Sequence, residues 1–289
     1  MGAKISILEP YLWTLGAIAI IAGVTFYPLA YSFYLSLTNY SFGLSNISFL
    51  GFENYIKAVN SQEFINSLKI STLYVVSCVA IEFILGLGSA LLLNTINKGA
   101  YAIRVLITLP VTITPVVAGL MWKWIMEPEV GILNYLLSLV GVPKQMWLGD
   151  PKLALWSIVF ADIWKNTPFV IIVTQAGLAS IPANLYEAAS IDGAGAWVRF
   201  KWITLPYLRP AMFVVLLSCT STAFKVFDSV YMLTQGGPGN LTQVLSLLIY
   251  QTGFKFSHLA YASALSYLMF VIVTFIAILY LKVVYPKGE

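Results

Sequence analysis

Charge is scarce in this 289-residue chain, because Asp, Glu, Lys and Arg make up only 10% of it while hydrophobic residues make up 59%. A soluble domain of ordinary composition carries about 25% charged residues. Sixteen basic and twelve acidic side chains cannot cover a soluble globule of this size. The composition therefore excludes a soluble enzyme, a disulfide-rich secreted scaffold and a disordered chain, and it indicates a protein that crosses a membrane several times.

Histidine and cysteine are scarcer still. The single histidine, His258, excludes a haem protein held by several imidazoles. The two cysteines, Cys78 and Cys219, lie inside apolar runs, which predicts small buried thiols and no disulfide. The net charge of +4 is small and scattered, so we expect no nucleic-acid partner.

Long apolar runs are what the chain does have. A helix crosses the hydrocarbon core in roughly 20 residues, and six apolar windows are long enough. We predict an all-α polytopic bundle forming a single transmembrane domain over 1–289, with helices at about 12–37, 70–93, 105–126, 153–178, 211–231 and 259–281. Prolines within these windows predict either tolerated kinks or breaks that expose backbone polar groups, at Pro28, Pro110, Pro115 and Pro168.

The distribution of Lys and Arg predicts the orientation, since basic residues favour the cytoplasmic side. With both termini inside, the cytoplasmic segments carry Lys4, Lys98, Arg104, Arg199, Lys201, Arg209, Lys282 and Lys287. The external segments then carry fewer basic residues and no arginine, namely Lys57, Lys69, Lys144, Lys152 and Lys255. We therefore predict an N-in, C-in, multi-pass protein of the cell membrane.

The only long inner loop, 179–210, is predicted to form a surface lever. Helix formers run from Asn184 to Asp192, and Gly193 suits the left-handed residue that follows a helix. A second short helix is expected from Ala194 to Ile203, and two prolines, Pro206 and Pro210, are expected to end it before the next membrane span.

This loop resembles the cytoplasmic signature of ABC importer permeases. That signature reads Glu-Ala-Ala, three residues, Gly, nine residues, then Ile-x-Leu-Pro, and the chain matches it at Glu187-Ala188-Ala189, Gly193 and Ile203-Thr204-Leu205-Pro206. The resemblance implies that the loop docks into a groove of a separate ATPase subunit, and that the coupling residues are Glu187, Ala188, Ala189, Asp192, Gly193 and Ala194.

Other segments are similar to carbohydrate-type permeases of that family: 51–55 (Gly-Phe-Glu-Asn-Tyr), 163–169 (Ile-Trp-Lys-Asn-Thr-Pro-Phe) and 224–238. The chain looks like the first of two related permeases of a maltose/trehalose-type importer. The resemblance implies a second permease, two ATPase subunits and an extracytoplasmic sugar-binding protein. No Gly-x-x-x-x-Gly-Lys-Ser/Thr loop occurs, so we expect no enzyme activity and no cofactor in this chain, with ATP and Mg bound by the partner ATPases.

Charged residues inside apolar windows are costly and are expected to face the bundle interior. Asp162/Lys165 and Lys225/Asp228 are each spaced i,i+3, so they either neutralise each other or offer polar contacts to sugar hydroxyl groups beside aromatic rings. The second interpretation, together with the position of the sugar site in related permeases, predicts seven substrate-binding residues: Lys165, Asn166, Phe169, Ser221, Phe224, Lys225 and Asp228. The last four are predicted to form one helical stripe. Glu82 has no evident partner in the sequence and is interpreted as structural. Clustered His, Cys or carboxylate residues are not evident, so no metal site is expected.

Two alternative functions stay open. An importer of the same family could carry glycerol phosphate or another anion, which Lys165 and Lys225 would bind. An ion-coupled secondary carrier would instead use the intramembrane charges as ion sites and would need no ATPase.

Overall fold

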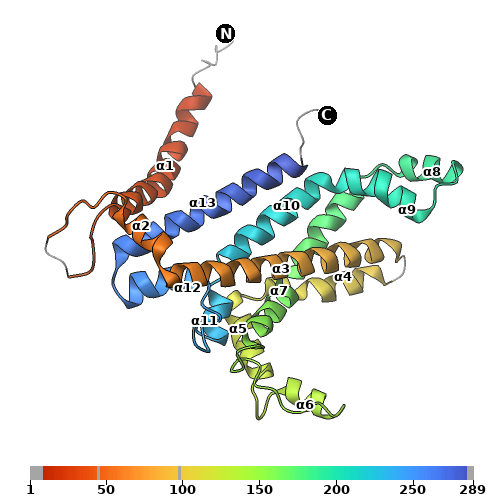
Figure 1. Ribbon diagram of the computed structural model, residues 1–289. Coiled ribbons are helices and arrows are strands. Elements are labelled where there is room, and N and C mark those ends of the chain that lie inside the picture. The colour runs from red at the N-terminus through yellow and green to blue at the C-terminus, as the bar shows by residue number, and fades with distance from the viewer. Residues whose placement is uncertain (1–8, 44–45, 97–98, 285–289) are drawn as a thin grey trace, which may run out of the picture. The chain divides into compact units, whose positions relative to one another are not determined.

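The computed structural model describes residues 9–43, 46–96 and 99–284, and Figure 1 shows that they are built from helices. Apart from one isolated bridge between Thr38 and Phe49, these ranges contain no strand. The predicted all-α class is confirmed. Three of the basic residues predicted to be cytoplasmic, Lys4, Lys98 and Lys287, lie outside the described residues.

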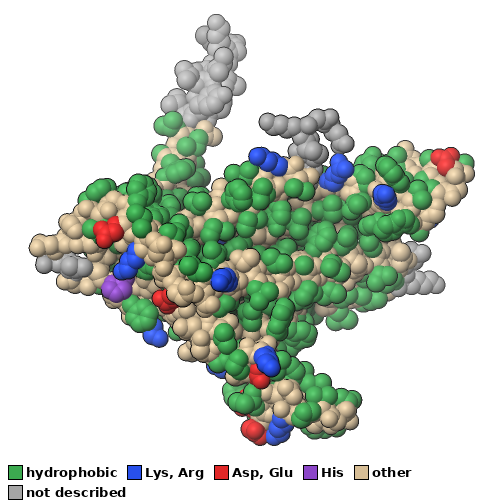
Figure 2. Space-filling view, viewed as in Figure 1, with side chains coloured by type: hydrophobic (Ala, Val, Ile, Leu, Met, Phe, Trp, Pro, Cys, Tyr) green, Lys and Arg blue, Asp and Glu red, His purple; other side chains and the backbone are tan. Residues whose placement is uncertain are grey.

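Five helices in the described ranges are long and apolar enough to cross a membrane. Each corresponds to a predicted window, and hydrophobic side chains cover most of the face seen in Figure 2, with only scattered charged ones. These spans are built on α1 (Glu9–Ser36), α3 (Gln62–Thr95), α7 (Ala154–Ala179), α10 (Leu205–Phe224) and α13 (Leu259–Val284).

The remaining window, 105–126, is broken, so of the two alternatives left open for its prolines the structure has the break. It consists of α4 (Ala100–Thr108), a 3₁₀ turn (Leu109–Thr112) and α5 (Pro115–Ile125), with a bend of 99° between the two helical arms. The cause is local, because Ile113 and Thr114 are extended and a residue before proline is disfavoured from the helical region. At Pro28 and Pro168, by contrast, α1 and α7 continue.

The helix predicted at 211–231 differs from the observed helix, α10, which both begins and ends earlier in the chain. α10 stops at Phe224 and a separate short helix, α11 (Asp228–Leu233), follows. Ser246 Oγ donates a hydrogen bond to the carbonyl oxygen of Val226, which satisfies a backbone acceptor left free by this break. A helix running unbroken to Tyr231 is therefore wrong.

The two prolines expected to end the second loop helix do not end it. That helix, α9 (Ala196–Arg199), continues through a π-helical turn (Phe200–Thr204) directly into α10. Pro206 lies in the first turn of α10, where a missing N–H is tolerated, and Pro210 lies inside the helix.

The described chain falls into two compact units. The first comprises the residues up to Ser61 together with Ile249–Leu268. It contains α1 and α2 (Glu53–Asn60), joined by a buried amide: Asn54 Nδ2 donates to the carbonyl oxygens of Ser36 and Thr38 at 2.9 and 2.7 Å. Along the chain, α12 (Leu245–Tyr250) begins in the second unit and ends in the first, and a π-helical turn (Gln251–Lys255) follows in the first.

The second unit comprises Gln62–Leu248 and the residues from Met269 onward. Its centre is a bundle in which α3 packs along α7 and both pack against α10. Figure 1 shows α8 (Ala183–Ile191) and α9 at one end of this unit, and α5, α11 and α6 (Ile132–Ser138) toward the other. The three-helix contact positions the candidate site.

Candidate functional site

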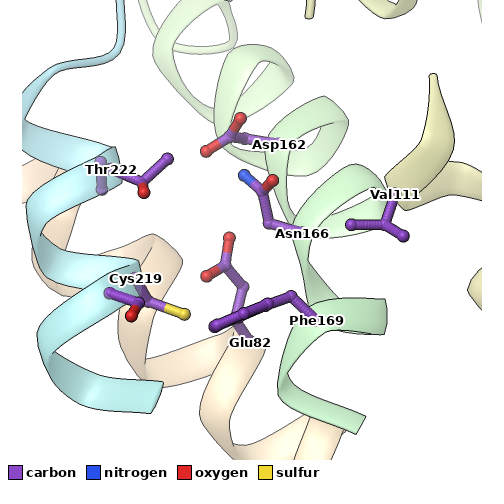
Figure 3. Close-up of a pocket in the computed structure, with 9 residues that line it drawn as sticks. Glu82, Val111, Asp162, Asn166, Phe169, Cys219 and Thr222 are labelled. Atoms are coloured by element: carbon purple, nitrogen blue, oxygen red, sulfur yellow. The ribbon is translucent and has the colours of Figure 1, made fainter. Parts of the chain in front are cut away.

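A cavity lined by both polar and apolar side chains lies between α3, α7 and α10 (Figure 3). Its volume is about 260 Å³. The lining residues are Glu82, Val111, Asp162, Asn166, Phe169, Ser218, Cys219, Thr222 and Ala223. Pockets for drug-sized ligands usually measure roughly 300–1,000 Å³, so this cavity fits one wall of a larger site better than a whole site.

Two carboxylates enter this cavity. Glu82 of α3 and Asp162 of α7 are only 2% and 6% exposed. Figure 3 shows the Glu82 side chain reaching from α3 into the space between α7 and α10. Glu82 Oε1 is buried without a hydrogen-bond partner among the described residues. An ionisable group in a membrane bundle costs at least about 2.5–3.5 kcal/mol on insertion, so its position here calls for a function.

Helical periodicity explains how the polar groups converge. Asp162, Asn166 and Phe169 are spaced i, i+4 and i+7 on α7, which places them on one face. Ser218 and Thr222 are spaced i and i+4 on α10 and face the same space. The wall therefore combines an aromatic ring with several hydrogen-bonding groups.

A second hollow of about 160 Å³ adjoins the first and shares Asp162, Asn166 and Thr222 with it. The other residues that line it come from α7, the break after α10, and the starts of α5 and α11: Pro115, Lys165, Lys225, Val226, Phe227, Asp228 and Ser229. The break after Phe224 thus turns Lys225 and Asp228 toward α7. We call this the outer hollow and the first the inner cavity.

The structure brings together five of the seven predicted substrate residues. Asn166 and Phe169 line the inner cavity, while Lys165, Lys225 and Asp228 line the outer hollow together with Asn166. No ion pair within 4.0 Å joins Asp162 to Lys165 or Lys225 to Asp228 in the part of the chain that the structure describes.

The other two predicted residues lie apart, so the single stripe from Ser221 to Asp228 is wrong. Phe224 is 3% exposed and lines a separate apolar hollow between α3, α10 and α13. Two residues along a helix are about 200° apart, so Phe224 lies opposite the cavity-facing Thr222. Ser221 is half-buried and lines neither the inner cavity nor the outer hollow in the described structure.

The loop at 179–210 has the predicted helix, bend and helix. Gly193 has φ of 71°, the left-handed conformation predicted for it, between α8 and α9. Glu187, Asp192 and Gly193 are exposed. Two side-chain contacts brace the loop: Tyr186 Oη with Thr204 Oγ1 at 2.8 Å, and Arg199 Nη1 with Ser190 Oγ at 3.1 Å.

The same loop is anchored to the bundle by apolar packing. Leu185, Tyr186 and Ile203 pack against a buried cluster formed by Ala90, Leu93, Ile171, Leu178, Ile181 and Leu208. These residues come from α3, α7 and α10 as well as the loop. The loop is therefore packed against the three helices that line the inner cavity.

The comparison with known families decides what kind of protein this is. Residues 82–286 match the family described as "Binding-protein-dependent transport system inner membrane component". The chain belongs to this family. The permease is accordingly a multi-pass component of the inner membrane, and the resemblance to ABC importer permeases seen in the sequence is confirmed.

Several relatives match the permease over nearly its whole length. It is 37% identical over 273 residues to the trehalose/maltose transport system permease protein MalF of Thermococcus litoralis, covering 94% of this chain and 92% of that protein. It is 35% identical over 277 residues to the trehalose transport system permease protein SugA of Mycobacterium tuberculosis, covering 94% and 88%. The sulfoquinovosyl glycerol transport system permease protein SmoG of Agrobacterium fabrum is 36% identical over 263 residues, covering 90% and 85%.

A solved structure has the same fold. A chain of a bacterial ABC transporter involved in the import of the acidic polysaccharide alginate superimposes with a TM-score of 0.82 at 24% identity, covering 96% of each chain. The helical architecture of the permease is thus that of an ABC importer subunit.

Sequence reasoning missed the role of α3. It interpreted Glu82 as structural and expected no cluster of Cys and carboxylate groups, whereas ligand atoms of Cys78, Glu82 and Asp162 lie within 4.8 Å of one another. Cys78 and Asp162 are 84 positions apart along the chain, so their spacing alone cannot pair them. The one available signal was the cost of placing an acidic residue, Glu82, in an apolar run. Three groups are fewer than the four ligands of a structural zinc site, and the geometry alone assigns no ion.

Proposed function

We propose that this permease is one of two related membrane subunits that carry a neutral di- or oligosaccharide, of the maltose/trehalose class, across the membrane by alternating access. The inner cavity supports this most directly. It places an aromatic ring, Phe169, beside hydrogen-bonding groups from three helices, among them Glu82 and Asn166. A saccharide presents apolar ring faces and hydroxyl groups, and this combination of side chains complements both.

The small size of the cavity supports a shared site. At about 260 Å³, it is smaller than a usual ligand pocket, so a second wall is needed to complete the site. A related permease facing α7 and α10 across a pseudo-two-fold axis supplies that wall. The names of the relatives MalF and SugA support a saccharide as the substrate.

The exposed loop supports coupling to separate ATPase subunits, which bind ATP and Mg. Glu187 offers a carboxylate to a basic group of the partner, and the small residues Ala188, Ala189 and Ala194 permit close approach. Asp192 and Gly193 set the bend between α8 and α9. An extracytoplasmic binding protein delivers the saccharide, in keeping with the family description.

Proteoliposomes containing the permease, its sister permease, the ATPase subunits and the binding protein test the proposal. Maltose, trehalose, glycerol phosphate and an anionic sugar are added one at a time, and ATP hydrolysis and uptake are both measured. We expect a neutral saccharide to stimulate hydrolysis and uptake together. Uptake that survives ATP removal but is abolished by an uncoupler would instead establish an ion-coupled carrier, and stimulation by glycerol phosphate or the anionic sugar alone would establish an anion importer.

A further inference from the structure

Glu82 carries an unmet hydrogen-bonding capacity. Its Oε1 atom is buried and has no donor among the described residues, although the residue is only 2% exposed. A buried polar atom without a partner is destabilising, and a ligand in an adjoining cavity is one way in which such an atom gains its missing hydrogen bond. The Glu82 side chain lines the inner cavity, so a ligand held there lies beside this carboxylate, and a small rotation of the side chain brings the unpaired oxygen to a donor on that ligand.

A second acceptor lies close by. The carboxylate of Asp162 lies within 4.8 Å of that of Glu82, and both line the inner cavity. Ionised carboxylates only accept hydrogen bonds, and charge-assisted hydrogen bonds are stronger than neutral ones. Two neighbouring hydroxyl groups on a sugar ring supply two donors side by side, which matches two adjacent acceptors.

The charges around the cavity favour a neutral ligand. No Lys or Arg is among the residues found to line the inner cavity; the basic groups nearest to it along the helices, Lys165 and Lys225, line the outer hollow with Asp228. Even where Glu82 and Asp162 share one proton, one negative charge stays in the wall. This charge repels an anion held in the inner cavity, although Lys165 of the adjoining outer hollow offsets part of it.

We propose that Glu82, acting with Asp162, is a specificity-determining residue that admits saccharides through their hydroxyl groups and rejects sugars bearing phosphate, sulfonate or carboxylate. This rests on the proposed sugar transport. It assigns α3 a direct contact with the substrate, in addition to its packing against α7. The outer hollow, with two lysines, is then a passage and not the selective site.

Equilibrium binding to the purified importer tests this without the binding protein, whose own specificity would mask that of the permease. The probes are maltose and trehalose, each paired with its 6-phosphate, and dissociation constants are measured by saturation-transfer NMR on the assembled permeases and ATPases. In the wild type we expect the preferred neutral disaccharide to bind at least about ten-fold more tightly than its phosphate. Glu82→Gln keeps the size of the side chain and removes its charge, and we expect it to reduce that ratio to about three-fold or less.

Two further variants complete the design. Asp162→Asn should shift the ratio in the same direction, and it keeps the test valid should Glu82→Gln assemble poorly. Ser67→Ala removes another buried, unpaired polar atom of α3, but outside the inner cavity, and should leave the ratio unchanged. A wild type that prefers the phosphate, or assembled charge-neutral variants with an unaltered ratio, would overturn the assignment while leaving sugar transport intact. A wild type that binds none of the four probes and transports no saccharide would refute the proposed function itself.

Discussion

The contact between α3 and α7 depends on the absence of a side chain at Gly86. A Cβ added there would lie 2.4 Å from Val170 Cγ1 and 2.5 Å from Val170 Cβ. Carbon atoms in contact prefer about 3.5–4.0 Å, so Gly86→Ala requires the two helices to separate by about 1 Å or more. Gly88, two residues along the same helix, has nothing within 4 Å of an added Cβ and provides a matched control.

The expected magnitude follows from comparing the two alanine variants. Alanine favours a helix over glycine by about 0.5–1 kcal/mol, and this gain applies at both positions. Overpacking costs about 1–3 kcal/mol and applies only at Gly86. The difference between the variants therefore isolates the packing cost, with Gly86→Ala less stable by about 1–3 kcal/mol.

Thermal unfolding of the purified importer, followed by tryptophan fluorescence, measures this difference. A change of 1 kcal/mol shifts Tm by about 2–4 °C in chains of 150–250 residues, so we expect Gly86→Ala to melt roughly 2–12 °C below Gly88→Ala. Gly86 lies one turn after Glu82, so the variant should also weaken saccharide-stimulated ATP hydrolysis. Equal Tm values for the two variants would refute the close approach of α3 to α7.

Three further substitutions test other parts of the structure. Asn134→Ala removes a buried amide that donates to the carbonyl oxygens of Pro128 and Gln145 at 3.0 and 2.9 Å. Limited proteolysis should therefore cut this variant within 127–152 faster than it cuts the exposed control, Ser138→Ala. Equal cleavage rates would contradict the bracing role of the amide. Gly193→Val forces a β-branched residue to φ of 71° and should reduce transport while membrane insertion stays intact. Gly195 has an ordinary φ and open space around it, so its variant Gly195→Ala should transport normally. Tyr186→Phe removes the hydroxyl contact across the loop and should lower the sugar transported per ATP hydrolysed, and an unchanged ratio would contradict a rigid lever.

The sequence was most informative where one segment determines its own structure. Apolar windows predicted the five long spans because a membrane helix closes its own hydrogen bonds, and the spacing after Glu187 predicted the left-handed Gly193. The predicted N-in, C-in orientation stays a prediction. Where the outcome depends on contacts between segments, the sequence was less informative: nothing in 211–231 alone reveals that Ser246 caps a break at Val226.

The candidate site shows the same limit. Asn166 and Phe169 could be assigned to one face of a helix by periodicity, and they do line the inner cavity. The stripe through Phe224 was wrong because the correct face of α10 runs through Ser218 and Thr222, a choice fixed by packing against α3 and not by composition. The convergence of Glu82 with Asp162 required the three-dimensional contact of α3 with α7.

A thiol already present in the inner cavity tests the central claim most directly. Cys219 lines this cavity, whereas Cys78 is fully buried and can be replaced by serine to leave one thiol in the chain. The measurement is the rate at which a small methanethiosulfonate reagent modifies Cys219, followed by mass spectrometry. It is made on the Cys78→Ser importer during turnover, with and without a saturating concentration of the transported saccharide. If the inner cavity is the translocation site, the saccharide slows the modification several-fold. Equal rates in an importer that takes up the saccharide normally would contradict the account.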